Sequence, residues 1–253
     1  MREIGGIKAG GGGGGSAIRP GREAQVLRRR LAGDLGGLPA TVYARIWREL
    51  IAAYCRLQGP LSVAVCAKEK SVGYWDVARD HFGSATRMTL HHAPGLVVRE
   101  VAEGRATVGL LPVLVTEESD PWWRSLRGTP GEPQVMARLP FVDGGGPRFE
   151  NLQAMVIAAL PYDPSGDDLS WLTVKSSEVL SRRTLNDHVR VAGFDGSIIA
   201  TIEERQTADY LIEAAGHIAA DDPRLADLAK RLPRGCRIAV IGAYARPIKV
   251  AVS

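Results

Sequence analysis

Hydrophobic residues in the first 58 positions repeat with the period of a helix. Residues 22–31 are expected to form a short helix, because Arg-Pro-Gly precedes them and a cluster of glycines follows. Residues 40–58 show the clearest helical pattern in the chain, and Gly59-Pro60 ends it. The large apolar residues of this stretch fall three or four positions apart: Val42, Ile46, Leu50, Ile51, Tyr54 and Leu57. We therefore expect residues 1–58 to be an all-helical segment.

Beyond this segment, short apolar runs alternate with helical stretches. The runs that read as strands are residues 61–67, 86–92, 106–113 and 154–160, and those that read as helices are 72–83 and 94–104. Strands that alternate with helices are typical of a parallel sheet covered by helices. Residues 59–160 are therefore expected to form a parallel α/β domain.

The last third of the chain follows a linker-like stretch rich in proline and aspartate at residues 161–168. Strands are predicted at 169–175, 197–204, 208–216 and 236–244, with helices at 176–187 and 221–232. This βαββαβ order is typical of a ferredoxin-like domain. The predicted fold class is thus multidomain α + α/β, with a helical segment (1–58), a parallel α/β domain (59–160) and a ferredoxin-like domain (161–253).

Charge is distributed unevenly along the chain. The whole chain carries +4, but residues 1–58 hold ten Lys or Arg and four Asp or Glu, a net charge of +6, which leaves −2 for the rest. A basic segment on a slightly acidic body favours an anionic partner. Nucleic acid is disfavoured because aromatic residues are not interleaved with the basic ones. A small polyanion is the better candidate.

Apolar runs and cysteines indicate where the protein resides. No run reaches about 18 apolar residues, so we expect no membrane span. No apolar core follows the first charges, so we also expect no secretory signal and a cytoplasmic protein. Cys55, Cys66 and Cys236 lack metal-ligand or CxxC spacing, so we expect free thiols and no metal site.

Several stretches resemble one family in the same order. REAQVLRRRL followed by LPATVYARIWRELIAAYCRLQGPLSVAV resembles the second and third helices of the all-helical chorismate mutase domain, running into a prephenate dehydratase domain. ARDHFG and VAEGRATVGLLPV resemble the dehydratase core, and ADYLIEAAGHIAADDPRLADLA with IGAY resembles the regulatory ACT domain. The chain thus resembles the bifunctional chorismate mutase/prephenate dehydratase family along nearly its whole length.

The resemblance implies a chorismate site within the helical segment. Lys8 and Gln58 match the family lysine and glutamine that reach the ether oxygen of chorismate. Arg22 and Glu23 match an Arg-Glu pair that binds substrate, with Glu23 accepting the substrate hydroxyl. Because chorismate rearranges by a pericyclic shift, catalysis needs a held conformer and positive charge at the ether oxygen, and no cofactor. The implied protein is a homodimeric chorismate mutase, an isomerase of aromatic amino-acid biosynthesis.

The chain also departs from the family. Most of the family's first helix has no counterpart, so the true start lies upstream of Met1, or mutase activity has been lost. Leu152, Gln153 and Ala154 stand where the dehydratase carries Thr-Arg-Phe, and SEVL at 177–180 replaces the ACT motif Gly-Ala-Leu. Two alternatives therefore stay open: an inactive regulatory protein that binds an aromatic acid, and a residual prephenate dehydratase.

Overall fold

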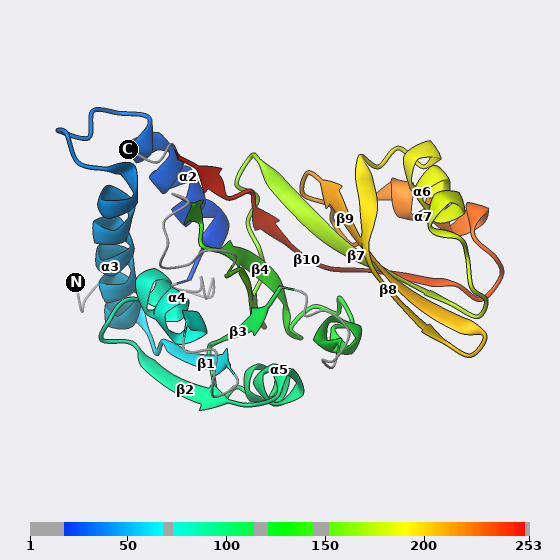
Figure 1. Cartoon of the computed structure of the whole chain (residues 1–253), viewed down its shortest axis with the longest axis horizontal. Helices are drawn as coiled ribbons and strands as arrows, with labels where there is room; N and C mark the ends of the chain where they lie inside the picture. The colour runs from blue at the N-terminus through cyan, green and yellow to red at the C-terminus, as the bar shows by residue number, and fades with distance from the viewer. Residues whose placement is uncertain (1–17, 68–72, 114–120, 144–151, 251–253) are drawn as a thin grey trace, which may run out of the picture.

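The protein is built around one long sheet. A computed structural model describes residues 18–67, 73–113, 121–143 and 152–250. Within these ranges, a sheet runs in the order β2-β1-β3-β6-β4-β10-β7-β9-β8. Figure 1 shows helices α2 to α5 around one end of this sheet and helices α6 and α7 at the other. None of the described helices is both long and apolar enough to cross a bilayer.

The α/β half contains the predicted parallel layer. Strand β1 (Ser62–Cys66) pairs in parallel with β2 (Arg87–His91) and with β3 (Val108–Pro112). Helices α4 (Gly73–Phe82) and α5 (Pro94–Ala102) connect these strands. The strands β1 and β3 are almost entirely buried, as expected for continuous apolar runs covered on both faces. This part of the sequence prediction is confirmed.

Shorter elements complete this half. Strands β6 (Ala154–Ala158) and β4 (Gln134–Leu139) extend the layer. Strand β6 pairs antiparallel with both β3 and β4, so the expectation that residues 59–160 form a parallel layer is wrong for this strand. A 3-10 turn, η1, spans Trp122–Ser125, and strands β5 (Val142–Asp143) and β11 (Ile248–Lys249) form a small separate pair.

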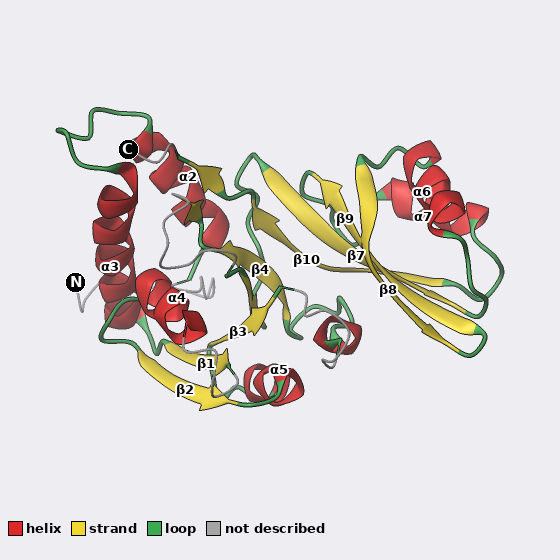
Figure 2. Cartoon of the chain, viewed as in Figure 1, coloured by secondary structure: helices red, strands yellow, loops and turns green. Residues whose placement is uncertain are grey.

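The C-terminal half has the predicted βαββαβ order. Its elements are β7 (Asp168–Ser176), α6 (Arg182–Val191), β8 (Gly196–Glu204), β9 (Thr207–Ala215), α7 (Pro223–Arg231) and β10 (Arg237–Ala245). Helix α6 was predicted over 176–187 but begins later, because Ser181 caps it by accepting a hydrogen bond from the backbone N–H of Thr184. Figure 2 shows both helices of this half on one face of its sheet.

Helices α2 (Pro20–Leu31) and α3 (Ala40–Gln58) pack on the sheet. Leu27 and Cys55 belong to the same buried apolar cluster as residues of β1, β4 and β6. Arg28 donates to Ser165 Oγ at 2.9 Å and to the carbonyl oxygens of Asp167 and Arg246 at 2.8 and 2.9 Å. The helical segment thus shares its core with the α/β half. The predicted three-domain division stays a prediction.

The two halves of the sheet meet at Gly242. Strand β10 pairs with β4 through Gly242 and Val135, and its register against β7 shifts just before Gly242. The φ angle of Gly242 is 135°, and a Cβ there would lie 2.3 Å from the carbonyl oxygen of Val135. Glycine is therefore the residue that this crossing requires.

We predict that Gly242→Ala lowers the free energy of unfolding by about 3 kcal/mol, because it combines an unfavourable φ with a backbone clash. The matched control is Gly216→Ala, where φ is +87° but no atom lies within 4 Å. That variant should lose only about 1 kcal/mol. Urea denaturation measures both, and equal losses would show that the close approach to Val135 is unimportant.

Candidate functional site

The predicted site residues occupy different environments. Lys8 lies outside the described residues. Arg22 is exposed on the first turn of α2, where its Nη1 donates to Gln25 Oε1 at 3.1 Å. Gln58 is the last residue of α3 and is also exposed. Of the described three, only Glu23 is turned into the protein, where a cavity lies between helices α2, α3 and α4 and the sheet.

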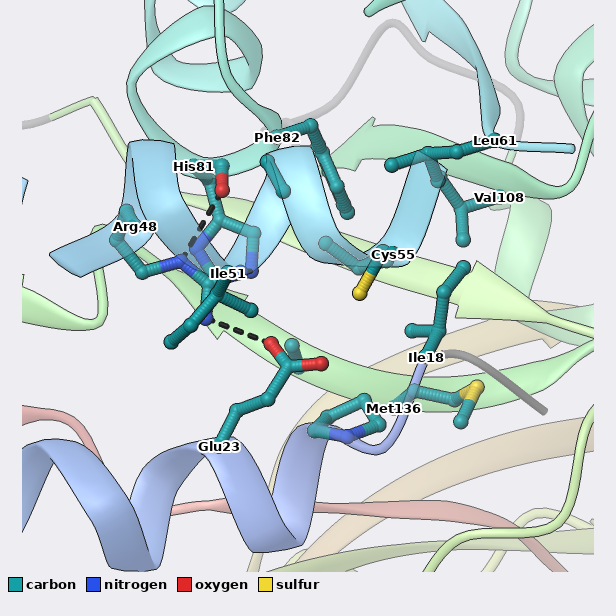
Figure 3. Close-up of a pocket in the computed structure, with 14 residues that line it drawn as sticks. Ile18, Glu23, Arg48, Ile51, Cys55, Leu61, His81, Phe82, Val108 and Met136 are labelled. Atoms are coloured by element: carbon teal, nitrogen blue, oxygen red, sulfur yellow. Dashed lines mark hydrogen bonds and ion pairs between the residues drawn. The ribbon is translucent and has the colours of Figure 1, made fainter. Parts of the chain in front are cut away.

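Glu23 is held by an arginine that the sequence analysis did not single out. Arg48 on α3 places Nη1 2.7 Å from Glu23 Oε2, and the two side chains are only 9% and 12% exposed. Figure 3 shows the carboxylate and the guanidinium facing each other across the cavity. Charge-assisted pairs of this kind are strong when the remaining donors are also satisfied.

The other donors of Arg48 reach helix α4. Its Nε donates to the carbonyl oxygen of His81 at 3.0 Å, and its Nη2 lies 2.9 Å from His81 Nε2. A guanidinium can only donate, so Nε2 accepts and the ring proton is assigned to Nδ1. One side chain therefore connects α2, α3 and α4.

The surroundings set the protonation of two neighbouring groups. Burial, followed by the charge of Arg48, holds the pKa of His81 well below its ordinary value, so the imidazole is neutral at pH 7. Burial and the nearby Glu23 carboxylate raise the pKa of Cys55 to about 11. The Cys55 thiol therefore stays protonated and is a poor nucleophile.

The cavity beside this pair is small and mostly apolar. Its volume is about 20 Å³, which is room for one water molecule. Apart from Glu23, Arg48 and His81, its lining includes Ile18, Ile51, Leu61, Phe82, Val108, Met136 and Val156. A ligand with a six-membered ring can enter only if the helices move apart. The structure thus presents a closed pocket with a permanent cation inside.

Gln58 is not brought to this pocket within one chain. It lies ten residues beyond Arg48 on α3, which is about 15 Å along the helix axis. Arg48 itself could have been suspected from the sequence, since it lies among small residues on the α3 face opposite the large apolar ones. That face consists of Ala44, Arg48, Ala52 and Cys55. His81 gave no such signal, because only the packing of α4 against α3 places it beside Arg48.

Residues 152–154, which stand at the position of the dehydratase triplet, do not line this pocket. Ala154 opens strand β6 and is fully buried. Gln153 Oε1 accepts a hydrogen bond from Arg138 Nη2 at 2.5 Å, and Arg138 Nη1 lies 3.6 Å from Glu213 Oε2. Leu152 lies against Gly73. None of these three residues has a carboxylic acid side chain. Arg138 links Gln153 to the carboxylate of Glu213.

We predict that the low pKa of His81 makes stability fall in mild acid. Unfolded histidine titrates near 6.5 and folded His81 titrates lower, so this contribution is complete above about pH 6.5 and is lost as the pH falls. The free energy of unfolding should drop by up to about 1.4 kcal/mol per pH unit from this group. Urea denaturation from pH 7.5 to 5 measures the slope. His81→Gln should flatten it, and an unchanged slope would contradict the assignment.

Comparison with known proteins gives a partial sequence match. The chain is 37% identical over 95 residues to a bifunctional chorismate mutase/prephenate dehydratase from Pseudomonas aeruginosa. The match covers 38% of this chain but only 26% of that protein. No family model matches the chain.

Solved structures show the fold. Prephenate dehydratase from Arthrobacter aurescens, in complex with L-Phe, has a TM-score of 0.54 at 13% identity, covering 74% of this chain and 90% of its own. Prephenate dehydratase from Streptococcus mutans has a TM-score of 0.50 at 12% identity, covering 75% of this chain and 100% of its own. The chain therefore has a prephenate dehydratase-like fold.

Proposed function

We propose that this chain binds a small cyclic dicarboxylate of the chorismate and prephenate class, at Arg48. The observation that carries the proposal is a permanent cation in an apolar pocket whose partner, Glu23, is a carboxylate. Arginine is suited to this role because its planar fork matches a carboxylate. The dehydratase-like fold and the partial match to a bifunctional enzyme support the ligand class.

The ligand carboxylate takes the place of Glu23. In the closed pocket Arg48 Nη1 donates a hydrogen bond to the Glu23 carboxylate. A ligand carboxylate offers the same kind of acceptor oxygens. The exchange keeps the buried guanidinium paired, so it avoids the cost of an isolated buried charge. Because the closed cavity is about 20 Å³, Glu23 and helix α2 must swing outward as the ring enters. The ring then lies among Phe82, Val108 and Met136.

The pocket is better suited to binding than to dehydration. Dehydration of prephenate requires an acid that protonates the leaving hydroxyl while carbon dioxide departs. His81 is neutral and Cys55 holds its proton tightly, so neither is a good acid at pH 7. This favours a regulatory or carrier role over a lyase at this pocket.

We predict that calorimetry of the full chain detects binding of prephenate or chorismate. Glu23→Gln removes the competing carboxylate and should raise affinity about tenfold, which corresponds to about 1.4 kcal/mol. Arg48→Met should abolish binding, and its melting temperature shows whether the variant is folded. Arg29→Gln is the matched control, because Arg29 is an exposed arginine on the same helix α2 and is not among the candidate site residues.

Three outcomes of this experiment would contradict the proposal. The first is no binding of either anion. The second is affinity that does not respond to Glu23→Gln or to Arg48→Met in a folded variant. The third is phenylpyruvate formed from prephenate in the same samples, which would contradict the regulatory or carrier role and favour the dehydratase alternative.

A second candidate is chorismate mutase activity. It is favoured by the match to a bifunctional mutase and by Glu23, which faces the pocket beside Arg48. We predict that, in this case, the chain consumes chorismate and that Lys8→Ala lowers the rate at least about 100-fold, as expected for loss of a transition-state donor. Chorismate absorbance follows the reaction. An inert chain, or a Lys8→Ala variant as active as wild type, removes this candidate.

A further inference from the structure

His81 is the third polar side chain of the pocket, and the binding step proposed above does not use it. It lines the cavity beside the ion pair and also a second cavity of about 10 Å³. Glu23 and Arg48 line both cavities as well. In Figure 3 Arg48 lies between His81 and Glu23, and its nitrogens are bonded to both residues. A ligand carboxylate that replaces Glu23 on Arg48 therefore lies next to His81.

The closed pocket is electrically balanced. The Glu23 carboxylate and the Arg48 guanidinium carry opposite charges, with Oε2 and Nη1 2.7 Å apart. The His81 imidazole is neutral, because burial and the charge of Arg48 lower its pKa. Its Nε2 accepts a hydrogen bond from Arg48 Nη2 at 2.9 Å. These three groups together carry no net charge.

Entry of a dicarboxylate alters this balance. The ligand brings two carboxylates, whereas the outward movement of Glu23 removes only one. Arg48 offsets one of the two, so the occupied pocket would hold one unpaired negative charge among apolar side chains. Burying an unpaired charge is costly. One proton on Nε2 of His81 removes that cost, because the imidazolium supplies the missing positive charge and donates a hydrogen bond.

We infer that His81 takes up one proton from solvent when a dicarboxylate binds, and that it thereby favours dicarboxylates over monocarboxylates. This inference rests on the proposed function. Protonated Nε2 no longer accepts from Arg48 Nη2, so both Nη atoms of Arg48 become free to bind one ligand carboxylate in a fork. The imidazolium donates to the other carboxylate. Its proton stays in that ion pair and is not passed to a leaving hydroxyl.

The other groups around His81 do not account for such a proton. Helix α2 contributes Glu23 to the cavities, and α3 contributes Arg48 and Cys55. The Cys55 thiol already holds its proton, with a pKa of about 11. Asp80, the neighbour of His81 on α4, is paired with an arginine of α3 at 2.7 Å and lines neither cavity. Among the described residues, the strands contribute only apolar side chains to the larger cavity: Val108, Met136, Ala137 and Val156.

Calorimetry of the full chain measures the proton directly. Binding heats of prephenate at pH 7 in Pipes and in imidazole, two buffers of different ionisation enthalpy, should differ by an amount that corresponds to uptake of at least about half a proton. Phenylpyruvate, a monocarboxylate with a similar ring, should bind more weakly and take up almost none. The affinity for prephenate should fall by up to about tenfold per pH unit between pH 6.5 and 8.5, and that for phenylpyruvate should stay constant.

His81→Gln keeps an oxygen acceptor for Arg48 but cannot take up a proton. This variant should bind prephenate about tenfold more weakly at pH 7, without proton uptake and without pH dependence, while its affinity for phenylpyruvate stays within about twofold of wild type. The matched control is His92→Gln, because His92 is exposed and lines neither cavity. Its binding should equal that of wild type, and melting temperatures show whether both variants are folded.

Nitrogen-15 NMR of the histidine-labelled wild type gives the same answer without a variant. One of the five imidazoles should change from neutral to cationic when prephenate is added at pH 7. Prephenate binding that depends on Arg48 but takes up no proton would overturn this inference and leave the proposed function standing. Proton uptake that persists in folded His81→Gln would also overturn it. Binding of neither anion would overturn both.

Discussion

The buried ion pair between Glu23 and Arg48 determines where the N-terminal helices lie. Arg48 binds the Glu23 carboxylate on α2 with one nitrogen and both the backbone and the ring of His81 on α4 with the others. Removing one partner of such a pair leaves an uncompensated charge and costs about 3–5 kcal/mol. The three helices are therefore coupled, and opening a pocket between them without an anion in place of Glu23 would leave Arg48 without its charged partner.

Helix α2 also links the helical segment to the C-terminal half of the fold. Arg28 on the same helix α2 is bonded to Ser165 and to the backbone of Asp167 and Arg246, at the start of β7 and just beyond β10. Strand β10 in turn carries Gly242, which joins the two halves of the sheet. An outward swing of α2 would thus strain contacts next to the βαββαβ half. The arrangement gives a physical route from the pocket to the C-terminal half.

Local patterns predicted most elements, because helix and strand periods depend on neighbouring residues. The parallel layer and the βαββαβ order follow from such patterns, whereas the late start of α6 depends on a cap at Ser181. The site was harder to predict. Glu23 was anticipated from family resemblance, but its partners Arg48 and His81 depend on how α3 packs on α4. Sequence periodicity also identified α3 correctly without revealing that its apolar side faces solvent.

The most direct test is a crystal structure of the chain grown with prephenate. We expect a ligand carboxylate within hydrogen-bond distance of Arg48, and we expect Glu23 to have moved out of the cavity together with the start of α2. A structure in which Glu23 stays on Arg48 while prephenate binds elsewhere would contradict this expectation.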